Sequence, residues 1–380
     1  MLTRRFFLNA SGAAVAALSM PRMAFARANT DRRFVFIIQR GAADGLSILG
    51  PTGDPQHESL RAGFDQDLAT GAKLDSFFTL HPALAETAKM YAAKQALFVH
   101  AVASPYRDRS HFDGQNVLET GGSSAYQLKD GWLNRLLGLL PPADSKALAI
   151  SDTVPMALRG NNQVSSYAPS KLPGPSDDLL QRVSALYEAD PQLHGLWNEA
   201  VATRMTAGDV EAGGQNGAAI GAIAAKLLSG ESGNRVAMIE TDGWDTHSGQ
   251  RGRLNAHLRN LDQTVSALKT GLGDDWSNTL VIVATEFGRT ARPNGTAGTD
   301  HGQASVAMLL GGAVAGGKVV ADWPGLSSAA LYEGRDLRPT TDLDALIAGA
   351  LTQHYGLSGR AMGSLFPESR GRPLTQPLIA

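Results

Sequence analysis

Residues 236–247 read VAMIETDGWDTH, and this stretch decides the expected fold class. An apolar run, residues 236–239, is followed closely by Asp242, Asp245 and His247. A buried strand that ends in such a loop is typical of open α/β sheets, which carry their chemistry at the carboxyl ends of the strands. Carboxylates and imidazoles are also common metal ligands, so these three side chains can converge on one cation.

Further apolar runs alternate with helical patterns along the chain. The runs that read as strands are residues 34–38, 96–102, 147–150, 279–285 and 304–310. Apolar residues recur at three- and four-residue steps from Leu254 to Leu272, which predicts one long amphipathic helix. This alternation predicts an α/β fold with a mostly parallel sheet flanked by helices on both faces. No composition shift marks a boundary, so residues 27–380 are expected to form a single domain.

Composition excludes several classes of protein. The net charge of −2 and the pI near 6.5 give no support for a nucleic-acid-binding protein. The chain contains no cysteine, so disulfides, thiolate nucleophiles and thiolate metal ligands are excluded. Any metal site must therefore use histidine, carboxylate or hydroxyl ligands. No strand is followed by the glycine pattern G-x-G-x-x-G, which argues against a dinucleotide-binding oxidoreductase.

The N-terminus resembles an export signal. Residues 3–8 read TRRFFL, a small-residue apolar stretch follows, and residues 24–26 read AFA, a typical cleavage site. The paired arginines match a twin-arginine signal over residues 1–26, with an ordinary secretory signal or a retained anchor as the alternatives. The expected location is therefore periplasmic or secreted, with the twin-arginine translocase as a partner during export. The apolar run is short and rich in glycine and alanine, so no stable membrane span is expected.

Several residues at or near the predicted strand ends are compatible with a metal site. They are Asp44, Asp242, Asp245, His247, Glu286, Asp300 and His301. One or two divalent cations held there, with zinc as one candidate, would activate a nucleophile and stabilise a leaving oxygen in ester hydrolysis. Arg107, Arg109 or Arg289 could bind the oxyanion through charge-assisted hydrogen bonds.

Several of the candidate residues also have a purely structural interpretation. Asp44 could be the N-cap of a helix, and Asp245 could cap the helix that follows it. Ser110 lies at the start of a predicted helix, where it could be a nucleophile or simply an N-cap. His247 could be an ordinary satisfied histidine. The metal hypothesis rests on the number of such groups and on their expected convergence at one sheet edge.

The order of the motifs resembles a known family. They are the signal TRRFFL, RGAADG at 40–45, RSHFD at 109–113, TDGWDTH at 241–247, EFGRT at 286–290 and DHG at 300–302. Over nearly its whole length the chain resembles the exported bacterial domain of unknown function 1501 family. That family is similar in turn to the alkaline phosphatase and sulfatase superfamily, which implies an alkaline phosphatase-like three-layer sandwich.

The superfamily resemblance implies roles for individual residues. Asp44 would match the metal aspartate after the first strand, and Ser110 the nucleophile at a helix start. Asp242 or Asp245 with His247 would match one metal site, which His301 completes. The spacing after Ser110 differs by about one residue, so His111 could occupy the aligned place.

The chain departs from the superfamily at residues 286–287. The superfamily usually has Asp-His after this strand, whereas the chain has Glu286-Phe287, which puts a second metal in doubt; Arg289 could supply the missing positive charge. The sulfatase signature is absent. The leading expectation is an exported metal-dependent hydrolase acting on a small-molecule or polymer ester, such as a phosphate ester. The alternative is a non-catalytic exported protein of the same fold that binds a surface polymer or a partner protein.

Overall fold

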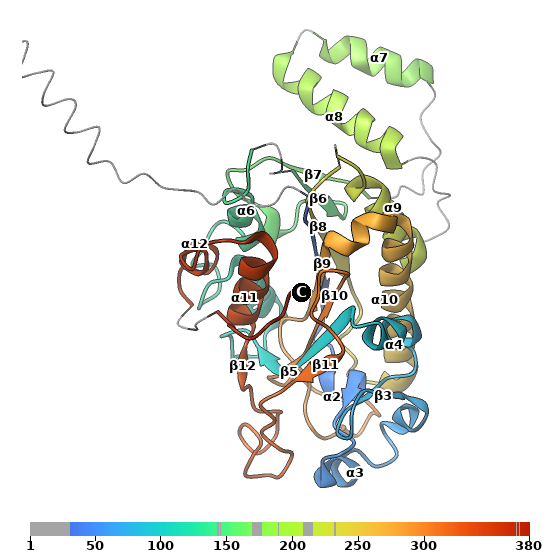
Figure 1. The fold of residues 1–380 in the computed structure, drawn as a ribbon, viewed down its shortest axis with the longest axis vertical. Coiled ribbons are helices and arrows are strands. Elements are labelled where there is room, and N and C mark those ends of the chain that lie inside the picture. The colour runs from blue at the N-terminus through green and yellow to red at the C-terminus, as the bar shows by residue number, and fades with distance from the viewer. Residues whose placement is uncertain are drawn as a thin grey trace, which may run out of the picture.

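A nine-stranded mixed sheet forms the centre of the protein in a computed structural model (Figure 1). The structure describes residues 31–380 except 143, 145, 169–176, 189, 208–215, 232, 370 and 372. The proposed signal, residues 1–26, lies outside this range. The strand order is β11-β5-β10-β9-β1-β8-β6-β7, and β12 pairs with β5. The strands are β1 (Arg33–Gln39), β5 (Ala96–Ala103), β6 (Ala147–Ile150), β7 (Val164–Ser166), β8 (Val236–Thr241), β9 (Thr279–Ala284), β10 (Ser305–Leu310), β11 (Lys318–Val320) and β12 (Thr341–Asp342).

Six of the eight strand pairs in this sheet are parallel, and the other two both involve β10. It runs antiparallel to both of its neighbours, β5 and β9. The sequence indicates a mostly parallel sheet but not the direction of this strand. The loop between β9 and β10 contains no helix, so the chain returns beside β9 without the long crossover that a parallel pair needs.

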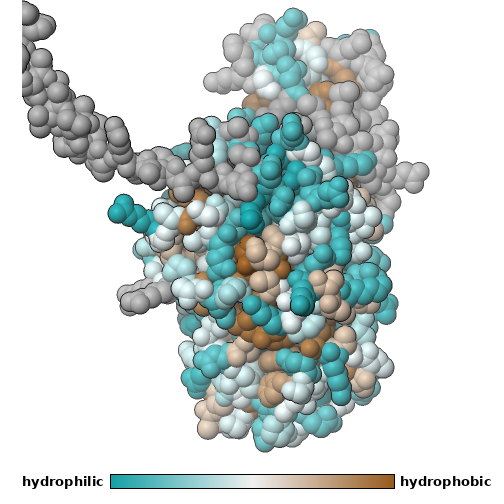
Figure 2. Space-filling view, in the orientation of Figure 1, coloured by the Kyte–Doolittle hydropathy of each residue, from teal (hydrophilic) through white to brown (hydrophobic). Residues whose placement is uncertain are grey.

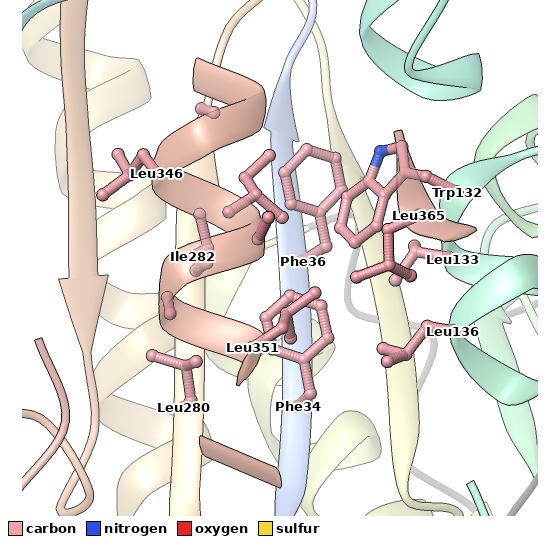
Figure 3. Close-up of a cluster of buried hydrophobic side chains, with 14 of the residues drawn as sticks. Phe34, Phe36, Trp132, Leu133, Leu136, Leu280, Ile282, Leu346, Leu351 and Leu365 are labelled. Atoms are coloured by element: carbon pink, nitrogen blue, oxygen red, sulfur yellow. The ribbon is translucent and has the colours of Figure 1, made fainter. Parts of the chain in front are cut away.

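Helices cover both faces of the sheet. Successive residues of a strand point to opposite faces, and in the central strands the residues on both faces are apolar, so each face packs against helices. Phe34 and Phe36 of β1 pack against Trp132 and the helices of one face (Figure 3). Those helices are α6 (Trp132–Leu137), α11 (Leu343–Tyr355) and α12 (Ala361–Leu365). Val35 and Ile37 pack on the opposite face against α4 (Ala85–Ala92), α9 (Gly217–Leu228) and α10 (Gln250–Leu272). The predicted α/β class, with a mostly parallel sheet flanked by helices, is confirmed.

Several shorter elements complete the structure. The sequence indicates a surface excursion over most of residues 45–80. In the structure this segment forms three short helices and a small sheet. The helices are α2 (Gly45–Ile48), α3 (Pro55–Arg61) and η1 (Gln66–Thr70), and the strands of the sheet are, in order, β2 (Leu49–Gly50), β4 (Thr79–Leu80) and β3 (Ala72–Lys73). The other elements are α5 (His111–Thr120), η2 (Met156–Leu158), α7 (Asp177–Tyr187), α8 (Pro191–Ala207) and η3 (Gly273–Asn278). Helices α7 and α8 form a hairpin at one end of the molecule (Figure 1).

Hydrophilic residues cover much of the face shown in Figure 2, with hydrophobic residues in limited patches between them. Among the described residues, no helix combines the length and hydropathy required to cross a membrane.

Candidate metal centre

Five loop segments, two of them from the single loop between β9 and β10, meet at one edge of the sheet. Strands β1, β5, β8 and β9 run in the same direction, so the loops that follow them leave at the same edge. Strand β10 runs the other way, so the loop before it reaches that edge too. The topology therefore gathers residues 40–44, 104–111, 242–247, 286–290 and 299–303, which are far apart in the sequence.

Three histidines and one aspartate converge there, and we call them the histidine cluster: His111, Asp245, His247 and His301. The Nε2 atom of His301 lies 2.9 Å from Nε2 of His111 and 2.9 Å from Nε2 of His247. The Asp245 carboxylate reaches the same point, 3.3 Å from His301 Nε2, 3.1 Å from His247 Nε2 and 3.4 Å from His111 Nε2. The ligand atoms of His111, Asp245 and His301 all lie within 4.8 Å of one another.

The other ring nitrogen of each histidine faces an oxygen. Nδ1 of His111 lies 2.9 Å from Glu286 Oε1, and Nδ1 of His247 lies 3.0 Å from Asp300 Oδ1. Nδ1 of His301 lies 2.9 Å from the backbone carbonyl of Arg109. Carboxylate and carbonyl oxygens only accept hydrogen bonds, so each Nδ1 donates its proton outward. In the neutral rings the three Nε2 lone pairs then point at one another, which is the arrangement that metal-binding histidines adopt.

Glu286 is the hydrogen-bond partner that orients the His111 ring. Its side chain is fully buried, and it also accepts hydrogen bonds from the backbone N–H of Gly41 at 2.8 Å and from Gln115 Nε2 at 3.0 Å. Burial opposes ionisation of Glu286, but the hydrogen bonds from His111, Gln115 and Gly41 outweigh it and hold its pKa below the ordinary value. Glu286 is therefore a carboxylate that fixes the His111 ring.

The ring of His301 differs in its electrostatics from that of His111. Burial lowers the pKa of His301, and the nearby charges of His111 and Arg289 lower it further. Burial also disfavours the charged form of His111, but the Glu286 carboxylate more than compensates, and the pKa of His111 is raised. His301 is therefore held neutral, as a metal ligand must be.

Arg289 holds the Asp245 carboxylate in the cluster. Its guanidinium is buried and donates from Nη1 to Asp245 Oδ1 at 2.6 Å. Its Nε donates to Thr299 Oγ1 at 3.1 Å, and Nη2 donates to the Thr299 carbonyl. Burial alone would raise the pKa of Asp245, whereas the hydrogen bond and charge of Arg289 lower it, so Asp245 stays ionised. In the structure, the predicted oxyanion ligand Arg289 therefore contacts Asp245 and Thr299.

The backbone is shaped to bring these loops together. Gly41 has a φ of +115°, and a Cβ atom there would lie 2.5 Å from the backbone nitrogen of Asp245. Only glycine fits this close approach, which also aims the Gly41 N–H at Glu286. Arg109 has a φ of 60°, a sparsely populated conformation for a residue with a side chain. Its carbonyl orients His301, while its guanidinium binds Asp336 and Glu333.

The structure sorts the predicted metal ligands into three groups. Asp245, His247 and His301 lie in the histidine cluster. Glu286 and Asp300 lie one hydrogen bond further out, as the partners of His111 and His247. Asp44 and Asp242 are not brought into the cluster. Asp242 is exposed and lines a cavity of about 490 Å³ together with Glu240, Trp244 and His257.

Asp44 belongs instead to a separate buried network, which we call the Arg61 cluster: Asp44, Ser47, Arg61, Asp65 and Gln250. The Arg61 guanidinium is fully buried and pairs with both Asp44 and Asp65. Asp44 also caps α2 by accepting from the Leu46 N–H at 3.1 Å. The interpretation of Asp44 as a helix cap therefore fits the structure, and its charge is already compensated by Arg61.

Ser110 is the N-cap residue of α5, and its backbone N–H donates to the Tyr106 hydroxyl at 3.2 Å. Among the described residues, no hydrogen bond links the Ser110 hydroxyl to the histidine cluster. The next residue, His111, is the one whose ring enters the cluster.

Sequence reasoning did not place His111 among the candidate metal ligands. It considered the residue only as an alternative at the place of the nucleophile. It also missed Arg40, which donates to Glu119 and Gln115 at 2.8 and 2.9 Å and to Glu240. Through Gln115, this arginine supports Glu286. The signal for His111 was its position at a helix start beside other metal-compatible motifs, and for Arg40 it was the Arg-Gly pair directly after the first strand.

Sequence comparison places the chain in a family. Residues 31–366 match the family described as Protein of unknown function (DUF1501), so the chain belongs to that family. No protein with curated annotation matches the sequence.

Several solved structures are similar to the chain at low identity. The C-terminal periplasmic domain of EcEptC from Escherichia coli, in complex with zinc, is 9% identical with a TM-score of 0.39, covering 93% of this chain and 94% of that one. The phosphonate monoester hydrolase of Agrobacterium radiobacter is 12% identical with a TM-score of 0.40, covering 90% and 79%. TAB5 alkaline phosphatase with magnesium bound is 11% identical with a TM-score of 0.37, covering 78% and 94%. Likenesses at this level say nothing of what the chain binds or catalyses.

Proposed function

We propose that the protein is an exported, metal-dependent hydrolase of phosphate or related esters, and that the histidine cluster holds one divalent cation. The observation that carries this proposal is the common orientation of the three histidines. Each donates outward from Nδ1, and their Nε2 atoms face one another beside the Asp245 carboxylate. Without a cation or a shared proton, the facing lone pairs would repel one another.

The donor set suits zinc. Three imidazole nitrogens with one carboxylate are typical zinc ligands, and the hydrogen-bond partners outside the ligands fix each ring as in known zinc sites. A cation bound there would polarise an ester oxygen and help to activate a nucleophile. The class of substrate comes from the motif order, which resembles the alkaline phosphatase and sulfatase superfamily.

We assign roles to the surrounding residues as part of the proposal. Ser110 remains the proposed nucleophile, because it precedes His111 at the N-terminus of α5, where the helix dipole favours negative charge. Arg109 and Arg289 act by positioning His301 and Asp245. Export through the twin-arginine pathway rests on the signal in residues 1–26.

The test uses protein purified without a metal-affinity tag. We expect elemental analysis to find about one equivalent of a divalent metal, and expect turnover of a phosphate monoester or diester with zinc, manganese or magnesium. Ser110→Ala should abolish turnover and keep the metal, whereas His111→Ala should lose both. Ser59→Ala, at an exposed serine of α3, is the matched control. Protein without bound metal, or turnover that survives His111→Ala, would contradict the proposal.

One observation favours a second candidate, a non-catalytic metal-binding protein that recognises a surface polymer or a partner protein. Phe287, where the superfamily resemblance implies a histidine, is buried and stacks on His111 with 5.0 Å between ring centroids. An apolar ring there supplies no ligand for a second cation. Bound metal with no turnover of any phosphate or sulfate ester would support this candidate, and robust turnover would exclude it.

A further inference from the structure

Two aromatic side chains are exposed near the first turn of α5, the helix that begins with His111 of the histidine cluster. The large apolar side chains that face solvent in the described part of the chain fall into two groups. Four are leucines of the α7–α8 hairpin. The other two are Phe112, which is 83% exposed, and Tyr126, which is 55% exposed. A phenylalanine ring that is so exposed contributes no burial energy to folding. An aromatic ring at a binding site, in contrast, offers a large apolar surface to a ligand.

Both aromatic residues border the helix turn that carries the metal ligand. Phe112 directly follows His111 in the first turn of α5. Tyr126 lies after the end of α5 but is tied back to it, because its backbone N–H donates to Asn116 Oδ1 at 2.7 Å. The Tyr126 hydroxyl also interacts with Asp113, which holds the phenol beside the first turn.

Helical spacing shows which way these residues face. Phe112, Asp113 and Asn116 share one side of α5, because residues three and four apart are neighbours on a helix. His111 and Gln115 share the adjacent side, which is turned towards Glu286. The two aromatic residues therefore flank the solvent side of the same turn whose other side forms the metal site.

The backbone of Tyr126 is constrained. Its φ is 62°, in the left-handed region that a bulky residue rarely adopts. The hydrogen bond to Asn116 holds this conformation and fixes where the Tyr126 ring lies. An exposed ring held in an unfavourable backbone conformation is typical of a residue kept for contact with a ligand.

We propose that Phe112 and Tyr126 form an aromatic rim that stacks against a ring of the substrate, namely the flat apolar face of an aryl group or of a sugar on the ester. The proposal rests on the proposed function, because it assigns the substrate class of the same site. The anionic ester group would lie at the histidine cluster, and the ring would lie outward along α5.

Binding measurements test the rim separately from catalysis. Zinc-loaded protein is titrated by calorimetry with phenylphosphonate, with a hexose 1-phosphate and with methylphosphonate, which share an anionic group but differ in the ring. We expect at least one of the two ring-bearing ligands to bind about threefold to tenfold more tightly than methylphosphonate. The better of the two identifies an aryl or a sugar substrate.

The variants Phe112→Ala and Tyr126→Ala should remove this preference and leave the affinity for methylphosphonate unchanged. Leu186→Ala, at an exposed leucine of α7, is the control and should keep the preference. Because both aromatic side chains are exposed, the variants should keep the unfolding temperature of the wild type.

Equal affinity for the three ligands, a ring preference that survives both substitutions, or no binding of any of them would overturn the aromatic rim. Failure of the proposed function has a different signature, namely no hydrolysis of any ester by metal-loaded protein. A ring preference without hydrolysis would keep the rim and favour the binding-protein candidate.

Discussion

The histidine cluster and the Arg61 cluster lie near the same edge of the sheet, and both contain carboxylates with a sequence pattern that suggests metal binding. In the Arg61 cluster, the buried guanidinium pairs with Asp44 and Asp65, so the protein supplies the cation. The histidine cluster contains facing Nε2 atoms beside a carboxylate. The difference teaches that charge compensation, rather than the presence of acidic residues at strand ends, separates a structural network from a candidate metal site.

The two clusters are connected by hydrogen bonds. Gln250 donates to Asp44 at 2.5 Å and accepts from Thr299 Oγ1 at 2.6 Å. Thr299 in turn accepts from Arg289, which holds Asp245. The Arg61 cluster is therefore linked by hydrogen bonds to the histidine cluster, and substitutions in the two clusters are predicted to have different consequences.

The largest effect on stability is expected from Arg61→Ala. This change leaves Asp44 and Asp65 buried without their cation, which costs about 3–5 kcal/mol of unfolding free energy. Urea unfolding measures the loss. The matched control is Arg251→Ala, because Arg251 pairs with Asp67 at the surface, where such a pair contributes about 0–1 kcal/mol. Similar losses of unfolding free energy in the two variants would contradict the distinction between a buried network and a surface pair.

The next effect is on metal affinity. His111→Ala removes one ligand nitrogen, and we expect zinc to bind at least about 100-fold more weakly, a loss of roughly 2.7 kcal/mol. Competition with a chelating dye measures the affinity. Asp44→Asn is the comparison variant, and it should lower stability while changing zinc affinity far less. Stronger dependence on Asp44 than on His111 would reverse the assignment.

A smaller effect is expected from Glu286→Gln. The amide oxygen can still accept from His111 Nδ1, but the negative charge that raises ligand basicity is lost, so zinc affinity should fall about tenfold. Glu333→Gln, at an exposed carboxylate paired with Arg109, is the control and should leave the affinity unchanged. Unchanged affinity in Glu286→Gln would show that the outer hydrogen bonds do not tune the site.

The smallest effect is a pH dependence that separates the clusters. Burial opposes ionisation of Asp65, but the charge of Arg61 and hydrogen bonds from His57, Ser47 and Arg61 lower its pKa below the ordinary value of 3.8. The unfolded chain then binds a proton at higher pH than the folded one. The stability from Asp65 is therefore complete above about pH 4 and is lost as pH falls further, by at most about 1.4 kcal/mol per pH unit.

Acid unfolding followed by circular dichroism checks this dependence. Asp65→Asn should flatten the pH dependence of stability below pH 4, and an unchanged slope would contradict the assigned pKa shift. Metal release should occur at higher pH, because protons compete with the cation for the imidazole nitrogens near pH 6–7.

Much of the fold could be predicted from sequence, because its strongest elements are long and periodic. The leucine spacing of α10 and the continuous apolar runs of β1 and β9 are determined by burial, which sequence patterns report directly. The direction of β10 and the small sheet β2-β4-β3 could not be predicted, because they depend on loop length and on contacts between short segments.

The candidate site could be predicted only in part. Convergence of Asp245, His247 and His301 follows from strand ends that share an edge. The position of Asp44 outside the cluster could not be predicted, because its partner Arg61 lies in the excursion after β1 and no local sequence pattern links the two residues. The rotation of α5, which brings His111 rather than the Ser110 hydroxyl to the cluster, depends on the residue at which the helix begins.

The most direct test of the central claim is an anomalous difference map from crystals of the protein grown with zinc, recorded on both sides of the zinc absorption edge. We predict one strong peak within coordination distance of His111, Asp245, His247 and His301, and none at Asp44. A peak at Asp44 or Asp242, or no peak near the three histidines, would contradict the claim.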